Sequence, residues 1–243
     1  METLFVVARY NEDISWIDQI DNGDFLIFNK GEEFETKYGY TRIPNVGREA
    51  ETYLKAIVLN YNILSNYDNV IFLQGNPIEH CFDLIDYLNS DPNEFKDIWC
   101  PLSHNCPELT FHRTEMLFYF PTIYQKIFPK LGEGINFSAD PIEEKYCRDL
   151  FDLLFMCGIN LERFHYNWAT GAQYSVPTSM ILNKPHSWWC KIYFLFEIYE
   201  KYKDGENKFP YIIERGWPAI WSYIPCSSSK LSISSNNESS NSD

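Results

Sequence analysis

The stretch "VIFLQGNPIEH", Val70 to His80, decides the fold. Its apolar run, Val70 to Leu73, is too short for an isolated helix, and Gly75 and Pro77 end it. Such a run is typical of a buried strand. In open α/β sheets, the loop after the carboxyl end of a strand is where ligands bind. The same residues also fit an ordinary strand-to-helix turn.

Two further strands are expected before this one. Apolar residues 4–8 lead into the polar segment "RYNED" (9–13), and "DFLIFNKG" (24–31) follows a turn signal at 21–23. An apolar stripe between Ala50 and Tyr61 has helical spacing, and Asn45 or Gly47 would cap that helix. Strands that alternate with helices predict an α/β fold with a three-layer, mostly parallel sheet and flanking helices.

The second half of the chain is less regular. Strands are expected within 97–103 and 171–176, and a helix is expected to carry Trp189, Ile192 and Phe196. "ERGWPAIWSYI" predicts a last short helical piece that breaks at Pro218. We expect one domain over 1–226, and a disordered tail over the Ser- and Asn-rich residues 227–243.

Composition excludes several classes of protein. The formal net charge of -14 argues against a general nucleic-acid binder, because neutralising phosphates requires clustered Lys and Arg. The chain has no long apolar run and no signal-peptide pattern, which predicts a cytoplasmic protein without a transmembrane segment. Walker A, GxGxxG and GxSxG patterns are all absent, and no cysteine spacing suggests a metal site.

Several segments suggest a family. "VVARYNED" resembles the first-strand segment of nucleotide-sugar glycosyltransferases of the GT-A fold, and "NVGREAETYLKAI" is similar to one of their helices. The order "VVARYNED", "NVGREAETYL", "VIFLQGNP", "GAQYSV", "ERGWP" resembles the domain of unknown function 3431 family over most of residues 4–224. The resemblance implies a GT-A-like architecture, a sugar-nucleotide donor, and a carbohydrate or other hydroxyl acceptor.

One departure from that pattern concerns the metal. Metal-dependent GT-A enzymes carry Asp-x-Asp after the apolar strand, and its carboxylates help to hold Mn²⁺ or Mg²⁺ against the diphosphate. Here the triplet is Gln74-Gly75-Asn76, which has no formal charge. Amide oxygens alone bind a divalent ion weakly. Either cations of the protein stabilise the leaving group, or no transfer takes place.

Candidate site residues lie in the loops that follow the three expected strands. If these strands are parallel, "RYNED", "NKG" and "QGNP" line one crevice. Arg9, Lys30, Arg48 and Arg215 are candidate cations for a diphosphate, although each also fits a structural salt bridge. On the resemblance, Asn11 and Glu12 lie near the nucleoside. The alternative is a helix N-cap ahead of "ISWI".

The remaining candidates concern the acceptor. On the resemblance, Glu214 is the general base that takes the proton of the attacking hydroxyl; an ordinary helical ion pair is the alternative. Trp168 and Trp217 are candidates for stacking on a sugar ring, or else belong to the core. His80 is a reserve candidate that also fits a hydrogen bond within its turn. The prediction is a glycosyltransferase, with a non-catalytic carbohydrate- or nucleotide-binding protein as the alternative.

Overall fold

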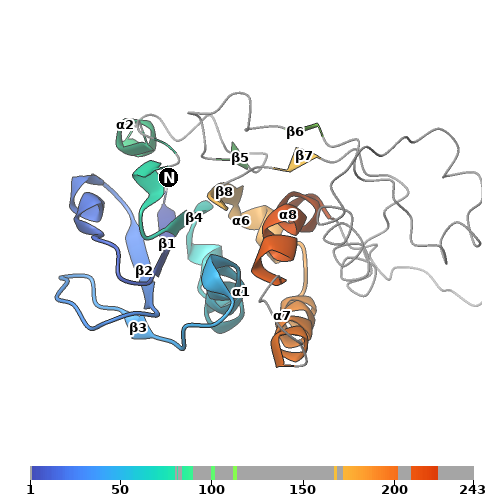
Figure 1. Cartoon of the computed structure of the whole chain (residues 1–243). Helices are drawn as coiled ribbons and strands as arrows, with labels where there is room; N and C mark the ends of the chain where they lie inside the picture. The colour runs from blue at the N-terminus through green and yellow to red at the C-terminus, as the bar shows by residue number, and fades with distance from the viewer. Residues whose placement is uncertain are drawn as a thin grey trace, which may run out of the picture.

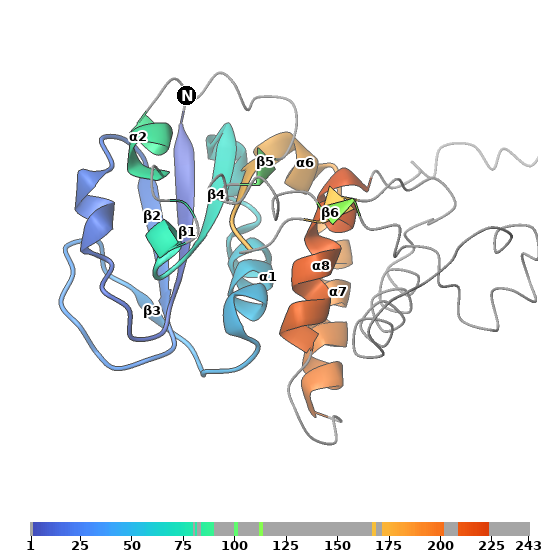
Figure 2. The same cartoon turned by 45° about the horizontal axis from the view of Figure 1, so that its top comes forward.

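The computed structural model describes residues 2–79, 81, 84–89, 100–101, 112–113, 167–168, 172–201 and 209–223. Its centre is a six-stranded sheet of order β3-β2-β1-β4-β8-β5 (Figures 1 and 2). The strands are β1 (Thr3–Arg9), β2 (Asp24–Asn29), β3 (Thr41–Arg42), β4 (Asn69–Gln74), β5 (Cys100–Pro101) and β8 (Tyr174–Pro177).

The sheet is mixed but mostly parallel. β3, β2, β1 and β4 run parallel to one another, whereas β8 runs antiparallel to both β4 and β5. The predicted α/β class with a mostly parallel sheet is therefore confirmed, as are the strands expected at 4–8, 24–31 and 70–73. A separate antiparallel pair joins β6 (His112–Arg113) to β7 (Asn167–Trp168).

Helices cover both faces of the sheet, as Figures 1 and 2 show. The long helices α1, α7 and α8 pack together on one face, with η1 and α2 on the other. The helical elements are η1 (Ser15–Gln19), α1 (Arg48–Asn60), η2 (Leu64–Asn66), η3 (Pro77–Glu79), α2 (Leu84–Asn89), α6 (Thr178–Leu182), α7 (His186–Lys201) and α8 (Phe209–Ser222).

The alternation of side chains along β4 explains its unbroken apolar run. Val70 and Phe72 belong to the core shared with α1, α7 and α8, and Ile71 and Leu73 belong to the core shared with η1 and α2. Successive side chains of a strand point to opposite faces, so a strand buried on both faces is apolar throughout. β4 is therefore the centre of a layered α/β structure.

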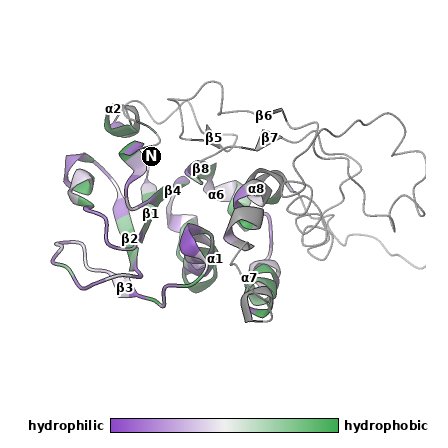
Figure 3. Ribbon diagram, viewed as in Figure 1, coloured by the Kyte–Doolittle hydropathy of each residue, from purple (hydrophilic) through white to green (hydrophobic). Residues whose placement is uncertain are grey.

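Helix α1 forms where the sequence pattern predicted a helix. The stripe between Ala50 and Tyr61 forms α1, which begins directly after Gly47 as predicted. Both hydrophilic and hydrophobic residues occur along α1 in Figure 3, as expected for a helix with one face in the core. No helix in the described ranges is long and apolar enough to cross a membrane.

The expected break at Pro218 is wrong. Helix α8 continues without interruption from Phe209 to Ser222. A proline inside a helix leaves the carbonyl of the residue four positions earlier without its donor. That residue is Glu214, and the Tyr174 hydroxyl donates a hydrogen bond of 3.3 Å to its main-chain oxygen. A tertiary contact therefore satisfies the group that the proline leaves unpaired. The tail, 227–243, lies outside the described residues.

Candidate functional site

The ends of three parallel strands meet at one edge of the sheet. Ala8 is in register with Gln74, and Arg9 is in register with Asn29, so β1, β2 and β4 end side by side. The loops 9–13, 29–31 and 74–77 follow directly at this edge. Their predicted common placement is confirmed.

The three loops pack tightly against each other. A Cβ on Gly31 would overlap the carbonyl group of Tyr10, and a Cβ on Gly75 would overlap the carboxylate of Glu12. The Trp16 indole also donates a hydrogen bond of 3.0 Å to the Gly75 carbonyl. The main chain of Tyr10 excludes a side chain at position 31, whereas a side chain at position 75 would require the Glu12 side chain to shift. The loop 9–13 thus fills the space between the other two.

Arg9 organises the centre of this edge. Its Nε donates to the carbonyl of Glu12 at 3.0 Å, and its Nη1 donates to the Asn29 side chain at 2.8 Å and to two further carbonyls. The guanidinium carbon lies 3.9 Å from the centre of the Phe34 ring. Arg9 is buried, with only 8% of its surface exposed. These contacts hold the loops together, so most of its hydrogen-bonding capacity is already used.

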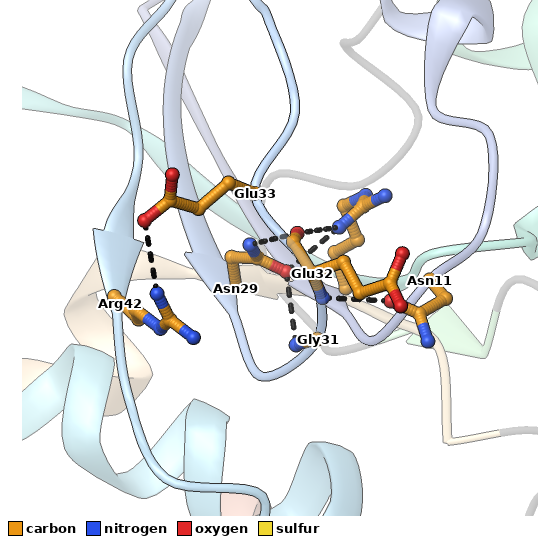
Figure 4. A network of polar contacts seen from close by, with 7 residues as sticks. Asn11, Asn29, Gly31, Glu32, Glu33 and Arg42 are labelled. Carbon is orange, nitrogen blue, oxygen red and sulfur yellow. Dashed lines mark hydrogen bonds and ion pairs between the residues drawn. The ribbon is translucent and has the colours of Figure 1, made fainter.

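Figure 4 shows how Asn29 connects the loops. The Asn29 side chain accepts a hydrogen bond from the Gly31 N–H at 3.1 Å and donates to the Glu32 carbonyl at 2.8 Å. Asn11 accepts one from the Glu32 N–H at 2.8 Å. Asn29 is fully buried, and a buried amide with hydrogen-bond partners restricts the conformation of its loop. Sequence reasoning missed Asn29, although its position at a strand end before "KG" is a usable signal.

Lys30 forms a buried ion pair instead of facing a ligand. Its Nζ lies 2.8 Å from Glu51 Oε2, and both side chains are buried. It also donates to the carbonyls of Val46 and Arg48 at the start of α1. Burial lowers the pKa of the Lys30 ammonium, and Glu51 offsets part of that effect. Of the two alternatives for Lys30, the structure therefore shows the structural salt bridge.

Each residue of the trio 11–13 has a local partner. Asp13 accepts hydrogen bonds from the N–H and the hydroxyl of Ser15 at the start of η1, in keeping with the expected helix start. Glu12 Oε2 accepts a hydrogen bond from the Tyr10 N–H at 2.6 Å. Asn11 is exposed beyond its contact with Glu32. The Glu12 carboxylate packs against Gly75 of the uncharged triplet.

The triplet Gln74-Gly75-Asn76 lies at the end of the central strand. Gln74 is partly buried and Asn76 is exposed, with its Nδ2 3.3 Å from Glu79 Oε2. Gln173 precedes β8 and donates to the Pro77 carbonyl at 3.2 Å, which ties the next strand to this loop. No cluster of metal-ligating side chains occurs within the described part of the chain.

Glu214 lies in α8, on the face of the sheet that α1 also covers. Burial raises the pKa of the Tyr53 hydroxyl, and the charges of Glu49 and Glu214 raise it further, so both carboxylates lie near Tyr53. Tyr53 donates to the Ala172 carbonyl at 2.9 Å. Arg48 is exposed at the first position of α1, and Arg215 follows Glu214 in α8.

The aromatic candidates have different positions. Trp217 is fully buried and stacks on Trp221, with ring centres 4.5 Å apart. Its ring is part of the core, the alternative given for it. Trp168 belongs to β7, paired with His112. His80 lies outside the described residues.

A pocket of about 680 Å³ opens beside this edge, on the η1 side. It lies between residues 9–18 and residues 34–37, and its wall includes Arg9, Glu12 and Phe34. Sequence reasoning did not identify the 34–37 segment, because an exposed loop between strands carries no pattern that marks it as a pocket wall.

Comparison of the chain with protein-family models, curated proteins and solved structures yields no match. The resemblance of "NVGREAETYL" and "FLQGNP" to the domain of unknown function 3431 family therefore stays a prediction. The function has to be argued from the site.

Proposed function

We propose that this chain is a glycosyltransferase of GT-A-like architecture that transfers a sugar from a nucleotide-sugar donor to a hydroxyl acceptor without a carboxylate metal site. The observation that carries the proposal is the position of Gln74-Gly75-Asn76. The triplet follows the central parallel strand, next to the ends of β1 and β2 and beside an antiparallel strand. The carboxyl edge of such a sheet is where α/β proteins bind their ligands.

The leaving diphosphate needs positive charge. Arg9 and Lys30 are buried and engaged by carbonyls and by Glu51, so neither is well placed to reach a diphosphate in solvent. Arg48 is exposed at the amino-terminal end of α1, a 13-residue helix whose dipole also favours anions there. In our proposal, Arg48 therefore offsets diphosphate charge, with Gln74 and Asn76 contributing amide hydrogen bonds.

The acceptor hydroxyl needs a general base. Glu214 is half-buried, and its charge acts on Tyr53, a residue of α1, the helix that begins at Arg48. In our proposal, Glu214 takes the acceptor proton while the sugar leaves the diphosphate. Asn11 and Glu12 line the edge from the neighbouring loop.

The test measures nucleoside diphosphate release from a panel of UDP-, GDP- and ADP-sugars, with Mn²⁺ and with EDTA, in parallel with thermal shift. We expect one donor to stabilise the protein and to be turned over in EDTA. Glu214→Gln should lower turnover by about 10²- to 10⁴-fold while keeping the thermal shift, as expected for loss of a general base. Arg48→Ala should weaken donor binding.

Matched controls come from the same edge. Arg42→Ala and Glu33→Gln change an exposed ion pair of 3.0 Å on the neighbouring strand and loop, and both should leave binding and turnover unchanged. Turnover that requires Mn²⁺ and is lost in Asn76→Ala would refute the metal-independent mechanism. If no sugar nucleotide shifts the melting temperature, the proposed function is wrong.

A second candidate function is supported by the internal contacts of Arg9 and Lys30. An edge where Lys30 and most donors of Arg9 are engaged by the protein itself can hold a carbohydrate or nucleotide without catalysing its transfer. For a non-catalytic binding protein, we expect a thermal shift with a sugar nucleotide or free sugar and no release of nucleoside diphosphate with any acceptor. Glu214→Gln should then leave the thermal shift unchanged.

A further inference from the structure

The pocket on the η1 side is separate from the region of Arg48 and Glu214. Its apolar wall is formed by Ile14, Ile17 and Phe34, which belong to the core on the η1 and α2 face of the sheet. α1 and α8, by contrast, pack on the opposite face. At about 680 Å³ the pocket has the size of an ordinary small-molecule site.

A buried cation lines this pocket with donors to spare. Arg9 uses Nε and Nη1 in four hydrogen bonds, to three carbonyls and to Asn29. Its Nη2 has no acceptor among the described residues, although Arg9 is only 8% exposed. The two N–H groups of Nη2 can donate charge-assisted hydrogen bonds to a carboxylate. A ligand acceptor at Nη2 would complete the site.

The rest of the pocket has the opposite charge. Glu12, Asp13, Asp18 and Glu35 line it, against the cations Arg9 and Lys37 alone. Asp13 accepts a hydrogen bond from the Ser15 N–H, and Asp18 forms an ion pair of 2.9 Å with Lys37. Glu35 has no ion pair or hydrogen bond with any described residue, and Glu12 keeps one oxygen, Oε1, without one. Free carboxylate oxygens accept hydrogen bonds from ammonium or guanidinium groups.

We propose that this pocket binds a cationic amino acid, a small molecule that carries both a carboxylate and a second, side-chain cation. Its carboxylate accepts hydrogen bonds from Arg9 Nη2. Its amino groups donate to Glu12 and Glu35 at the rim, and its alkyl chain lies along Phe34. The excess of carboxylates in the lining favours a ligand with net positive charge. The assignment does not rest on the proposed sugar transfer.

Isothermal titration with free L-lysine tests the assignment, in the absence of any nucleotide and at low ionic strength. Hexanoate keeps the carboxylate and lacks both amines, and cadaverine keeps both amines and lacks the carboxylate. We expect L-lysine to bind at least about tenfold more tightly than either analogue, because each loses charge-assisted hydrogen bonds at one end of the pocket.

Two matched variants locate the binding. Glu35→Gln removes a carboxylate of the pocket lining, whereas Glu33→Gln removes one two residues away that does not line it. We expect Glu35→Gln to weaken L-lysine binding about tenfold and Glu33→Gln to leave it unchanged. Equal binding of L-lysine and hexanoate, equal effects of the two variants, or no L-lysine binding would each overturn the proposal. Because sugar-nucleotide turnover is measured separately, either proposal can fail alone.

Discussion

The Tyr174 hydroxyl donates its hydrogen bond to the main-chain oxygen of Glu214, the carbonyl that Pro218 leaves without a helical donor. This contact joins β8 to α8 at the place where the helix would otherwise have an unsatisfied group. It also fixes the backbone of the residue that we propose as general base. The position of Glu214 relative to the sheet therefore depends on Tyr174.

A double-mutant cycle tests this relationship. Tyr174→Phe should destabilise the protein by about 1 kcal/mol, because a partly buried carbonyl loses its donor. Pro218→Ala restores a main-chain N–H to α8, so Tyr174→Phe should cost less in that background. Urea unfolding of the four proteins gives the coupling free energy. An equal cost in both backgrounds would show that the hydroxyl does not replace the missing helical donor.

The strands, α1 and the common edge of the three loops follow from local patterns, so the sequence predicted them. The apolar run of β4 and the helical stripe of α1 are each read within a few residues. The uninterrupted α8 is different, because its continuation past Pro218 depends on Tyr174, which lies 40 residues from Glu214 in sequence. Such a contact has no local signal.

The same distinction applies to the candidate site. That Lys30 follows a strand was visible in the sequence, but no local pattern indicated its partner Glu51, which lies in the first turn of α1. Which cation meets a ligand and which meets a carboxylate depends on how α1 packs against β2. The role of the 34–37 segment likewise depends on how that loop folds back toward η1.

The ion pair between Lys30 and Glu51 gives the next prediction. Glu51→Leu should destabilise the protein by about 3 kcal/mol, because it leaves the buried Lys30 ammonium without its carboxylate. Lys30→Met should cost less, because Glu51 keeps Lys55 as a partner. The double variant should recover part of the loss, since neither charge then remains. Glu51 also contacts Lys55 at 2.5 Å, so recovery should be larger when Lys55→Met is added.

Unfolding in urea measures these changes. Lys37→Met, which removes an exposed pair with Asp18, is the control and should cost less than about 1 kcal/mol. Single changes that are no worse than this control would mean that the pair is not buried in solution.

Gly31 provides a steric test of the packed loops. Alanine at this position would place its Cβ on the Tyr10 carbonyl and beside the Asn11 amide, which are held by other contacts. Gly31→Ala should therefore destabilise the protein by several kcal/mol or prevent folding. Gly39→Ala is the matched control: Gly39 has a φ of +69° but open space around it. It should cost only about 1 kcal/mol, the cost of the left-handed backbone alone.

Circular dichroism and thermal unfolding separate the two glycine variants. A Gly31→Ala protein as stable as Gly39→Ala would show that loop 9–13 does not lie against residues 29–31.

The buried Lys184 should make the stability of the protein depend on pH. It is fully buried, and its Nζ donates to the carbonyls of Met180 and Trp221 and to the Asn183 side chain, at 2.8, 3.1 and 3.1 Å. The Trp188 and Trp189 rings lie within 6 Å, at 5.9 and 5.8 Å, and no described carboxylate contacts it. Burial lowers the pKa of its ammonium from 10.5 to about 7.

The direction of the effect follows from this lowered pKa. Between the folded value of about 7 and the unfolded value of 10.5, the unfolded chain binds the proton and the folded chain does not. Stability should therefore rise with pH across this window, with a slope of up to about 1.4 kcal/mol per pH unit from this group. Tyr61, whose hydroxyl donates to the Lys184 carbonyl, stays neutral at pH 7 to 9, because burial raises its pKa above the ordinary 10.0.

Lys184→Met keeps the length and apolar character of the side chain and removes the titrating amine. The free energy of unfolding of the wild type, measured in urea at pH 7, 8 and 9, should rise relative to that of the variant by about 1 kcal/mol per unit. The buried Lys30 is shared by both proteins, so its own lowered pKa cancels in the difference. Parallel pH profiles would mean that Lys184 stays charged in the folded protein, held by the carbonyls at the ends of α6 and α8. If Lys184→Met is more stable than the wild type at pH 7, and this advantage is smaller at pH 9, burying the Lys184 ammonium destabilises the folded protein. The advantage shrinks because the amine loses its proton as the pH rises.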